Sequence, residues 1–306
     1  MKKLLVISLC LTLFLSACGS SENKSESKVS ENKTSSTQIF KQDDGKRVRI
    51  PKNPKKIVVL HPTYIGALIK FGHKPIGVSE FVKQNKTLNK ATKGIERIGQ
   101  GNIEQVIKLK PDLIITTKED KNSKKLQKVA PTVQLDAMKS NYKRTTKSLS
   151  QIVNEQDKAE KWLKDWEKKL QKDKKELSNK VKGKTITAIQ ATPKGISAFS
   201  SNYGRGTEIV YDGYGMKQPK LLEKKTKNAY MTILSEETLS DYTGDYIILA
   251  TLGEKPPFTE KENWKNIEAV KNGRVINLDL EDTQYNDPIS LEKQRKIIYQ
   301  QLKEIK

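Results

Sequence analysis

Short apolar runs alternate with amphipathic stretches along most of this chain. The runs are rich in Val, Ile, Leu and Thr, which is typical of strands buried on both faces, and the stretches between them have helical periodicity. This alternation predicts α/β units with parallel sheets. We place strands at 56–60, 75–78, 113–116, 132–135, 185–190, 246–251 and 274–278.

A different pattern separates the first four of these strands from the last three. From Gln151 to Val181 the apolar residues recur at spacings of three, four and seven, with no proline or glycine among them. This spacing predicts one long amphipathic helix. Trp162 and Trp166 lie four residues apart on one face of it, and we expect them to pack rather than to contact a ligand.

The segments on either side of this helix resemble each other. Glu104 precedes Asp112 by eight residues and Glu237 precedes Asp245 by eight, and an Ile-Ile pair follows each aspartate. The match predicts two α/β lobes, each with a helix that carries a glutamate at a similar height. Ligand sites favour the interface between such lobes, so we expect a binding cleft there.

The N-terminus has the pattern of an export signal. Two lysines precede an apolar run that ends at Leu15 and is too short to span a bilayer. The sequence from Leu15 to Cys18 resembles the bacterial lipobox, in which the cysteine is acylated and becomes the new N-terminus. We expect 1–17 to be a signal peptide, Cys18 to be the lipidation site and 18–38 to be a flexible tether at the outer face of the cell membrane.

The chain is strongly basic, with a formal net charge of +22. Removal of residues 1–17, which contain two lysines and no acids, leaves 22 − 2 = +20. The lysines interleave with acidic residues and only 6% of the chain is aromatic, which argues against a nucleic-acid partner. Cys10 and Cys18 are the two cysteines, so the processed chain has no disulfide framework and depends on a sizeable core.

The residue inventory also argues against an enzyme. The sequence contains no Gly-x-Ser-x-Gly elbow, phosphate-binding glycine loop or His-Glu-x-x-His motif. His61 and His73 are the two histidines, too few for a typical zinc or manganese cluster. His61 ends a predicted strand, where it could contact a ligand or hold a structural hydrogen bond. We predict a binding protein with no catalytic residue and no cofactor.

Ten short motifs follow one another in an order that is informative. They are Asp43–Lys46, Ile50–Ile57, Pro62–Tyr64, Ile98–Gly99, Lys110–Ile115, Val129–Thr132, Gly204–Gly206, Gly244–Tyr246, Trp264–Ile267 and Tyr285–Pro288. Together they resemble the substrate-binding lipoproteins of ABC importers for ferric siderophores, in particular the ferric-hydroxamate binders of Gram-positive bacteria. The resemblance covers residues 39–306.

The resemblance implies a class III substrate-binding protein. In this fold two α/β lobes with mostly parallel sheets are joined by one long rigid helix. We assign 39–150 to the N-terminal lobe, 151–182 to the bridging helix and 183–306 to the C-terminal lobe. The resemblance also implies a monomer whose partners are a ferric siderophore and the permease subunits of an ABC importer.

The resemblance also assigns residues to these partners. A glutamate of each lobe would dock onto arginines of the permease, and the matching positions are Glu104 and Glu237, with Glu236 as the neighbouring alternative to Glu237. A Tyr-Gly-Arg-Gly segment matches the cleft motif of the family, with Tyr203 where relatives often carry Trp, and with Arg205 as the cation. Its glycines would let the backbone and a ligand approach closely.

A ferric siderophore carries iron that is already enclosed in oxygen ligands. The protein therefore needs donors for those oxygens rather than ligands for the metal. A guanidinium offers forked hydrogen bonds, and tyrosines offer flat contact area with a hydroxyl. By family position Tyr64 and Tyr285 also face the cleft, beside Tyr203 and Arg205.

Two other ligands and one other class of function remain open. A citrate-type siderophore would suit a basic cleft, and haem could use Tyr203 as an axial ligand. We favour a near-neutral iron(III)-hydroxamate because Arg205 is the cation that the resemblance places in the cleft. A lipid-anchored adhesin held to anionic polymers by charge is the alternative of another class, and binding of a small ferric chelate that is insensitive to salt would argue against it.

Overall fold

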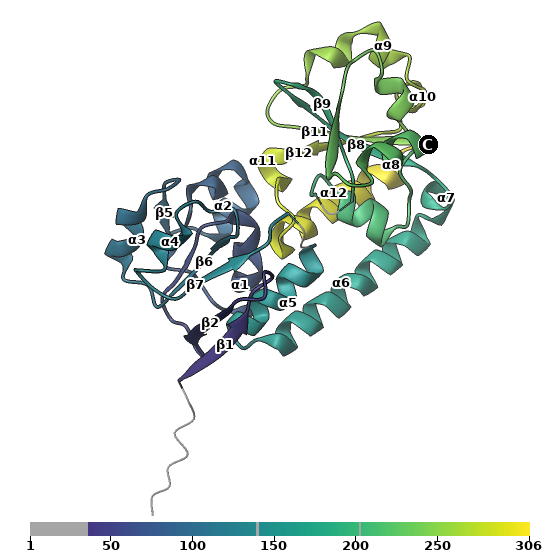
Figure 1. Ribbon diagram of the computed structural model, residues 1–306. Helices are drawn as coiled ribbons and strands as arrows, with labels where there is room; N and C mark the ends of the chain where they lie inside the picture. The colour runs from purple at the N-terminus through teal and green to yellow at the C-terminus, as the bar shows by residue number, and fades with distance from the viewer. Residues whose placement is uncertain (1–35, 139–140, 202) are drawn as a thin grey trace, which may run out of the picture. The chain divides into compact units, whose positions relative to one another are not determined.

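A computed structural model describes residues 36–138, 141–201 and 203–306 of the protein (Figure 1). The predicted signal peptide, Cys18 and the predicted tether up to residue 35 lie outside the described residues. A hairpin of β1 (Thr37–Lys41) and β2 (Arg47–Pro51) comes first, and we did not predict it. Thr37 and Gln38 were assigned to the tether but belong to β1.

The N-terminal lobe contains a five-stranded sheet in which all neighbouring strands are parallel. The strand order is β5 (Glu96–Ile98), β4 (Gly77–Ser79), β3 (Ile57–Val59), β6 (Leu113–Thr117) and β7 (Thr132–Leu135). The helical elements are η1 (Pro62–Tyr64), α1 (Ile65–Phe71), η2 (Glu80–Gln84), α2 (Lys86–Ala91), α3 (Ile103–Leu109), α4 (Ser123–Leu126) and α5 (Tyr142–Ile152). The four strands predicted for this lobe are confirmed. β5 was missed because Glu-Arg-Ile is not an apolar run.

The C-terminal lobe contains a mixed five-stranded sheet. The strand order is β10 (Met231–Leu234), β9 (Gly195–Phe199), β8 (Ile186–Thr192), β11 (Tyr246–Thr251) and β12 (Val275–Asp279). β8, β11 and β12, which we predicted, are parallel, whereas β9 is antiparallel to both of its neighbours. The helical elements are η3 (Glu208–Gly213), α8 (Lys220–Thr226), η4 (Leu239–Tyr242), η5 (Pro257–Glu260), α9 (Glu262–Lys265), α10 (Glu268–Lys271), α11 (Leu280–Thr283) and α12 (Pro288–Glu304).

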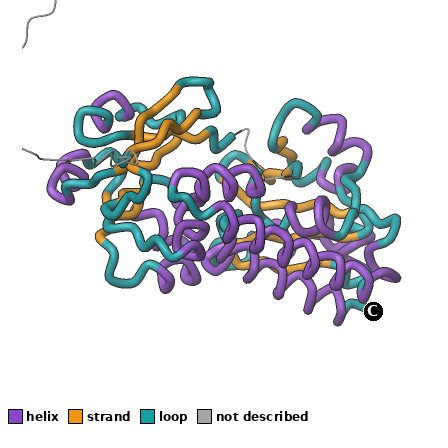
Figure 2. Tube along the Cα trace, turned by 90° about the horizontal axis from the view of Figure 1, so that it is seen from below, coloured by secondary structure: helices purple, strands orange, loops and turns teal. Residues whose placement is uncertain are grey.

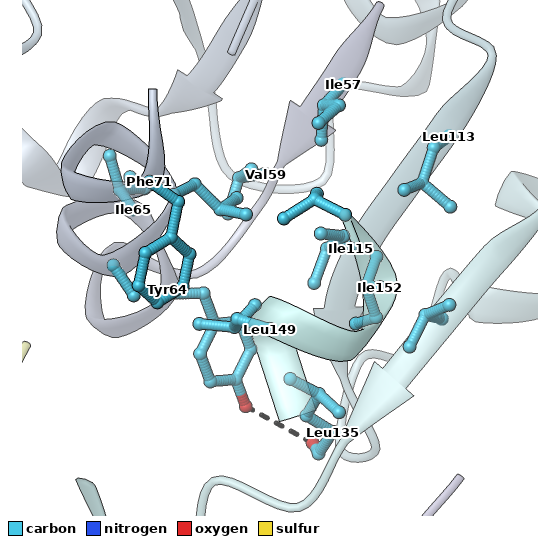
Figure 3. Packing of buried hydrophobic residues seen from close by; sticks show 14 of the residues in the cluster. Ile57, Val59, Tyr64, Ile65, Phe71, Leu113, Ile115, Leu135, Leu149 and Ile152 are labelled. Atoms are coloured by element: carbon cyan, nitrogen blue, oxygen red, sulfur yellow. Dashed lines mark hydrogen bonds between the residues drawn. The ribbon is translucent and has the colours of Figure 1, made fainter. Parts of the chain in front are cut away.

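Each lobe has its own hydrophobic core. In the N-terminal lobe Val59 and Ile115 of the sheet meet Phe71 of α1 and Leu149 of α5 (Figure 3). Full burial of an aliphatic or aromatic side chain stabilises a fold by about 1.5 to 3 kcal/mol, so these contacts hold the helices on the sheet. Figure 2 shows the strands of the two sheets as separate groups with helices beside each. None of the helices within the described residues is long and apolar enough to cross a membrane.

The long helix α6 (Gln156–Glu176) joins the two cores. Ala159 near its start packs in the N-terminal core, whereas Trp166 packs in the C-terminal core. Trp162 and Trp166 stack with ring centroids 5.6 Å apart, which confirms that they pack. The element predicted over 151–182 is thus a long connecting helix in its central part.

The ends of that predicted helix are wrong. Gln151 and Ile152 belong to α5, and the chain turns before α6 at Asn154, whose φ is 56°. Asparagine adopts this left-handed conformation more readily than most residues, so a helix can end there without glycine or proline. At the other end Leu177 separates α6 from a short α7 (Ser178–Val181).

A second helix also contacts both cores. Ile289 at the start of α12 packs against the N-terminal core, and Ile298 further along lies in the C-terminal core. At the same end of α12 the Asn85 side chain donates a buried hydrogen bond to Ser290 Oγ at 3.0 Å. α12 therefore packs on both cores in addition to α6, the one long helix that joins the lobes as predicted.

The repeated aspartates have the same task in each lobe. Asp112, just before β6, accepts hydrogen bonds from the backbone N–H groups of Lys55 and Lys56 at 2.7 and 3.0 Å. Asp245, just before β11, accepts one from the backbone N–H of Thr185 at 2.8 Å. Each carboxylate thus fixes the start of the neighbouring parallel strand, β3 or β8, and this explains the matched spacing in the two halves of the sequence.

Candidate functional site

Residues of both lobes line a central hollow of about 220 Å³. His61 and Met138 of the N-terminal lobe contribute to it, and so do Tyr203, Arg205 and Tyr285 of the C-terminal lobe. The structure therefore brings together three of the four residues that we predicted to contact a ligand. We call this space the central hollow.

Two larger hollows adjoin the central one. The N-side hollow, of about 610 Å³, lies over the carboxyl ends of β3, β4 and β6 and shares His61, Gln284 and Tyr285 with the central hollow. The C-side hollow, of about 860 Å³, shares Met138 and Tyr203 with it. These shared walls place the three hollows side by side along one cleft, whose two larger parts are in the usual size range of ligand sites.

The guanidinium of Arg205 is held in place by its neighbours. Nε and Nη2 donate to Gln190 Oε1 at 3.0 and 2.8 Å, and Nη1 donates to the Tyr203 carbonyl oxygen at 3.0 Å. The group also lies 4.5 Å from the centroid of the Phe199 ring, in a cation–π arrangement. An arginine has five N–H groups, so these bonds leave one on Nη1 and one on Nη2 for other acceptors. Arg205 is thus a preoriented donor in the wall of the central hollow.

The backbone around Arg205 is left-handed at three successive residues. The φ angles are 73° at Gly204, 56° at Arg205 and 80° at Gly206. This conformation costs a residue with a Cβ about 1 to 2 kcal/mol, so the loop holds Arg205 against strain. A Cβ at Gly206 would lie only 2.4 Å from Ile298 Cδ1. The close approach that we predicted for these glycines is present at Gly206, but its partner is α12 rather than a ligand.

A buried carboxylate lies behind this loop, and sequence analysis missed it. Glu208 is 0% exposed and begins η3, which is a π-helix. Its Oε1 accepts hydrogen bonds from the backbone N–H of Gly204 at 2.8 Å and from Asn286 Nδ2 at 3.0 Å. Burial raises the pKa of Glu208, and these hydrogen bonds oppose that shift. Glu208 therefore ties the Arg205 loop to the segment that carries Tyr285, as a positioning residue.

The two charges also influence each other. Burial lowers the pKa of the Arg205 guanidinium, whereas attraction to Glu208 raises it. An arginine keeps its proton in proteins, so Arg205 presents a positive charge to the cleft. Gln190 is a second partner that we missed, although its place at the carboxyl end of a predicted strand is a usable signal.

Tyr203 provides an aromatic wall. Its ring stacks on Tyr230 with centroids 4.1 Å apart and planes 11° apart, and its hydroxyl contacts Met138 Sδ at 3.1 Å. Burial raises the pKa of Tyr203 to about 12, so the phenol is neutral at physiological pH. The prediction that Tyr203 lies in the cleft agrees with its position between the central and C-side hollows.

Tyr285 lines the central hollow, and its hydroxyl is already bonded within the protein, so its ring is the part that a ligand can contact. The hydroxyl donates to the Phe81 carbonyl oxygen at 2.8 Å and lies 3.3 Å from Gln84 Oε1, both in the N-terminal lobe. Burial raises the pKa of Tyr285, and the charge of Asp287 adds to the shift. The side chain thus contacts both lobes and forms part of the central and N-side hollows.

Tyr64 does not line the cleft, so its predicted contact with a ligand is corrected here. The side chain is 1% exposed, and its hydroxyl donates to the Leu135 carbonyl oxygen at 3.2 Å (Figure 3). The residue lies near the end of a strand as predicted. Its ring turns into the N-terminal core, where the hydroxyl finds a buried acceptor.

His61 occupies the position in the cleft that we expected of Tyr64. It lines the central and N-side hollows, and its ring centroid lies 4.9 Å from that of Tyr64. Nδ1 is buried, and the described residues offer it no hydrogen-bond partner. Burial lowers the pKa of His61 to about 4, so the imidazole is neutral at physiological pH. Of the two readings that its sequence position left open, its placement favours contact with a ligand.

The two predicted docking glutamates are both exposed. Glu104 lies in the first turn of α3, as expected. Glu237 lies in the turn before η4, so the expected helix is absent at that position. Glu236 pairs with Lys261 at 2.7 Å, whereas hydrogen bonding to the Ser235 side chain lowers the pKa of Glu237 and keeps it charged. Of these two glutamates, Glu236 is therefore the one held in an ion pair with Lys261.

Both glutamates follow an edge strand at the same end of its sheet. Ile98, the last residue of β5, is level with Ser79 at the carboxyl end of β4. Leu234, the last residue of β10, pairs with Ile196, which pairs with Ala191 near the carboxyl end of β8. Each lobe thus exposes a glutamate at the edge where its parallel strands end.

This cleft combines one fixed cation with flat aromatic walls. Such an arrangement can donate hydrogen bonds to ligand oxygens and pack against a bulky ligand. Among the described residues, no group of three or more His, Cys, Asp or Glu side chains could hold a metal ion. Two α/β lobes that are joined by a long helix and enclose such a cleft define a substrate-binding protein.

Comparisons with known proteins give the family. A model described as periplasmic binding protein matches residues 57–281. The iron(3+)-hydroxamate-binding protein FhuD of Bacillus subtilis (strain 168) is 38% identical over 303 residues, which cover 96% of this chain and 95% of that protein. The chain therefore belongs to the periplasmic binding protein family.

Solved structures agree with this assignment. The FhuD protein from S. pseudintermedius has a TM-score of 0.82 at 37% identity, over 87% of this chain and 98% of that one. FhuD2 from Staphylococcus aureus with bound ferrioxamine B has a TM-score of 0.78 at 35% identity, over 82% of this chain and 99% of that one. The α/β fold of two mostly parallel sheets with a long helix between them is thus the FhuD-type fold.

Proposed function

We propose that this protein captures iron(III)-hydroxamate siderophores outside the cell and delivers them to the permease of an ABC importer. The observation that carries the proposal is the fixed guanidinium of Arg205 beside the rings of Tyr203 and Tyr285. The names of the relatives support it, because one is called an iron(3+)-hydroxamate-binding protein and another holds ferrioxamine B.

The chemistry of the cleft suits a chelate whose iron is already saturated with oxygen ligands. The two N–H groups that remain on Arg205 would donate to hydroxamate oxygens, and a hydrogen bond to a charged group contributes about 1.5 to 3 kcal/mol. The rings of Tyr203 and Tyr285 would pack against the hydrocarbon of the chelate. His61 is neutral, so the central hollow presents one positive charge to a near-neutral ligand.

The same residues argue against haem. As an axial ligand Tyr203 would have to turn its hydroxyl to the haem iron, but its ring is stacked on Tyr230 and its hydroxyl contacts Met138 Sδ at 3.1 Å. A hydroxamate complex makes no such demand, because its iron needs no ligand from the protein. The neutral phenol of Tyr203 can then serve as a contact surface.

Delivery would use the two exposed glutamates. Glu104 and Glu237 lie at corresponding edges of the two lobes, where they could meet arginines of a two-subunit permease. Three relatives are named as lipoproteins, which supports acylation at Cys18 and an anchored position on the outer face of the membrane. A single chain would present both glutamates, so we propose a monomer.

Calorimetric titration of residues 19–306 would test the ligand. Trp162, Trp166 and Trp264 all lie outside the linings of the three hollows, so calorimetry is a safer readout than tryptophan fluorescence. The panel contains ferrichrome-type, ferrioxamine-type, citrate-based and catecholate ferric complexes and haemin. Saturable binding of the hydroxamates is expected. Binding of only the citrate complex or haemin would contradict the ligand, and binding of none would favour the adhesin.

A further inference from the structure

The C-side hollow differs in charge from the rest of the cleft. Its charged lining consists of Lys220, Lys224, Lys227 and Glu223, which gives 3 − 1 = +2. The charged lining of the N-side hollow is Glu119, Asp120 and Lys121, which gives 1 − 2 = −1. The proposed function uses Arg205 in the central hollow but gives the three lysines of the C-side hollow no role.

The three lysines form one stripe on α8 and the residue that follows it. Lys220, Lys224 and Lys227 are spaced by four and three residues, which places them on the same face of a helix. Leu222, 0% exposed, anchors the opposite face in a second hydrophobic cluster of the C-terminal lobe, with Ile247 and Leu249. Within residues 36–138, 141–201 and 203–306 none of the three lysines forms a salt bridge. Their charges are therefore available to a ligand.

An aromatic wall connects this stripe to the central hollow. Tyr203 lines both hollows, and Tyr230, stacked on it, continues the surface into the C-side hollow. Ser200 fixes Tyr230 in place, because its backbone N–H and its Oγ both donate to the Tyr230 carbonyl oxygen, at 2.9 and 3.0 Å. A ligand held at Arg205 could thus extend along the two rings to the lysines.

We infer that the C-side hollow is a subsite for a carboxylate carried on the outer arm of a ferric hydroxamate, an inference that rests on the proposed function. Three hydroxamate groups neutralise the charge of Fe³⁺, so the ferric core of such a chelate gives the lysines nothing to recognise. A carboxylate on an arm that leaves the core beside Tyr203 would lie in their field.

The residue type sets the size of the effect. A lysine is a compact charge on a flexible stem, so three of them can follow an arm of variable length without fixing one geometry. Exposed ion pairs are weak and are screened by salt. We therefore expect the carboxylate to raise affinity by roughly threefold to tenfold at low salt, and by much less at high salt.

A matched pair of ligands isolates the carboxylate. The terminal amine of ferrioxamine B is converted either to its acetamide, which is neutral, or to its succinamide, which ends in a carboxylate. Calorimetry then compares the two ferric complexes on the wild-type chain at about 20 mM and about 500 mM salt. The variant Lys220→Gln/Lys224→Gln/Lys227→Gln should bind both complexes equally, and the single variant Lys224→Gln should show an intermediate ratio.

A control variant separates the subsite from the overall charge. Lys164→Gln/Lys168→Gln/Lys175→Gln removes three exposed positive charges from α6 and none from the cleft. This variant should keep the wild-type preference for the succinamide. Equal binding of the two complexes by the wild type would overturn the inference, and so would an equal loss of preference in both triple variants. If the wild type bound neither complex, the proposed function itself would fail.

Discussion

The sheets of the two lobes have the same number of strands but differ in the direction of one strand. In each sheet an aspartate before one parallel strand fixes the start of its neighbour: Asp112 fixes β3, and Asp245 fixes β8. An edge strand in each lobe, β5 or β10, is followed by an exposed glutamate. Between the edge and the central strand the N-terminal lobe has the parallel β4, whereas the C-terminal lobe has the antiparallel β9.

This difference separates the two functions proposed for the lobes. Glu104 and Glu237 follow corresponding edge strands of the two sheets, so each lobe contributes one glutamate to the surface proposed for docking. The reversed strand β9 leads into the loop with Tyr203 and Arg205, which has no counterpart in the N-terminal lobe. The N-terminal lobe instead contributes the neutral His61. The proposed ligand recognition is therefore unequal between the lobes, whereas the proposed docking is symmetric.

The largest expected effect is on transport. Glu104→Ala/Glu237→Ala should abolish siderophore-dependent iron uptake by cells, because each lobe would lose its contact with the permease. Affinity for the ferric siderophore should not change, since neither residue lines the three hollows. Each single variant should reduce uptake, which would show that both lobes take part.

The control for this experiment removes two other exposed glutamates. Glu160→Ala/Glu304→Ala makes the same change of charge away from the ends where the parallel strands finish and should leave uptake unchanged. Normal uptake by the Glu104→Ala/Glu237→Ala variant would show that these two glutamates do not dock the protein onto the permease.

The loop unique to the C-terminal lobe can be tested through its glycines. Gly206→Ala should lower the free energy of unfolding by about 2 to 5 kcal/mol, because strain at a φ of 80° adds to a clash with Ile298. Gly183→Ala is the control, since its φ is 73° and nothing lies within 4 Å of its added Cβ. It should cost about 1 to 2 kcal/mol. Equal costs in urea unfolding would mean that α12 yields to the new methyl group.

The buried imidazole of His61 in the N-terminal lobe predicts that the stability of the protein depends on pH. The pKa of His61 is about 4 in the folded chain and 6.5 ordinarily, so between these values the unfolded state binds the extra proton. The free energy of unfolding should therefore fall as pH drops from 6.5 to about 4, by up to about 3 kcal/mol. His61→Gln should remove this part of the fall, and the control His73→Gln should retain it. An unchanged pH profile in His61→Gln would show that the imidazole is protonated normally.

The smallest expected effect is a difference between the two aspartates. Asp112→Ala and Asp245→Ala should each lower the free energy of unfolding by about 0.5 to 1.5 kcal/mol, because each removes the acceptor of backbone hydrogen bonds that water can partly replace. Asp245 also accepts from Thr185 Oγ1 at 2.9 Å and pairs with Lys184 at 3.2 Å, so its variant should lose slightly more. A near-zero effect of either substitution in chemical denaturation would break the equivalence of the lobes.

The strands predicted from the sequence are those whose run of apolar residues is buried in the folded sheet. Of the seven predicted strands, all but β12 are mostly buried, whereas the missed strands β5 and β10 are short and partly exposed. β9 is buried and pairs with β8 across a two-residue turn, but its Gly, Ser and Ala have low strand propensity. The break at Asn154 was missed because a left-handed asparagine has no signal as strong as glycine or proline.

The site was predictable to a similar extent. Tyr203, Arg205 and Tyr285 lie together in the cleft, as the resemblance implied. Tyr64 was misplaced because the end of a strand fixes the position of a backbone but not the side on which its ring packs. Glu208 was missed because its burial depends on a loop and a segment that are distant in sequence from each other.

The most direct test of the account is the affinity of Arg205→Ala for ferrioxamine B, measured by calorimetry beside Arg47→Ala, an exposed arginine on β2. We expect Arg205→Ala to weaken binding by about 1.5 to 3 kcal/mol, the range for a hydrogen bond to a charged group. The chain should still fold, with a lower melting temperature because Gln190 and the Tyr203 carbonyl lose their donor. Arg47→Ala should bind like the wild type. Wild-type affinity in Arg205→Ala would contradict the claim that this guanidinium holds the ferric hydroxamate.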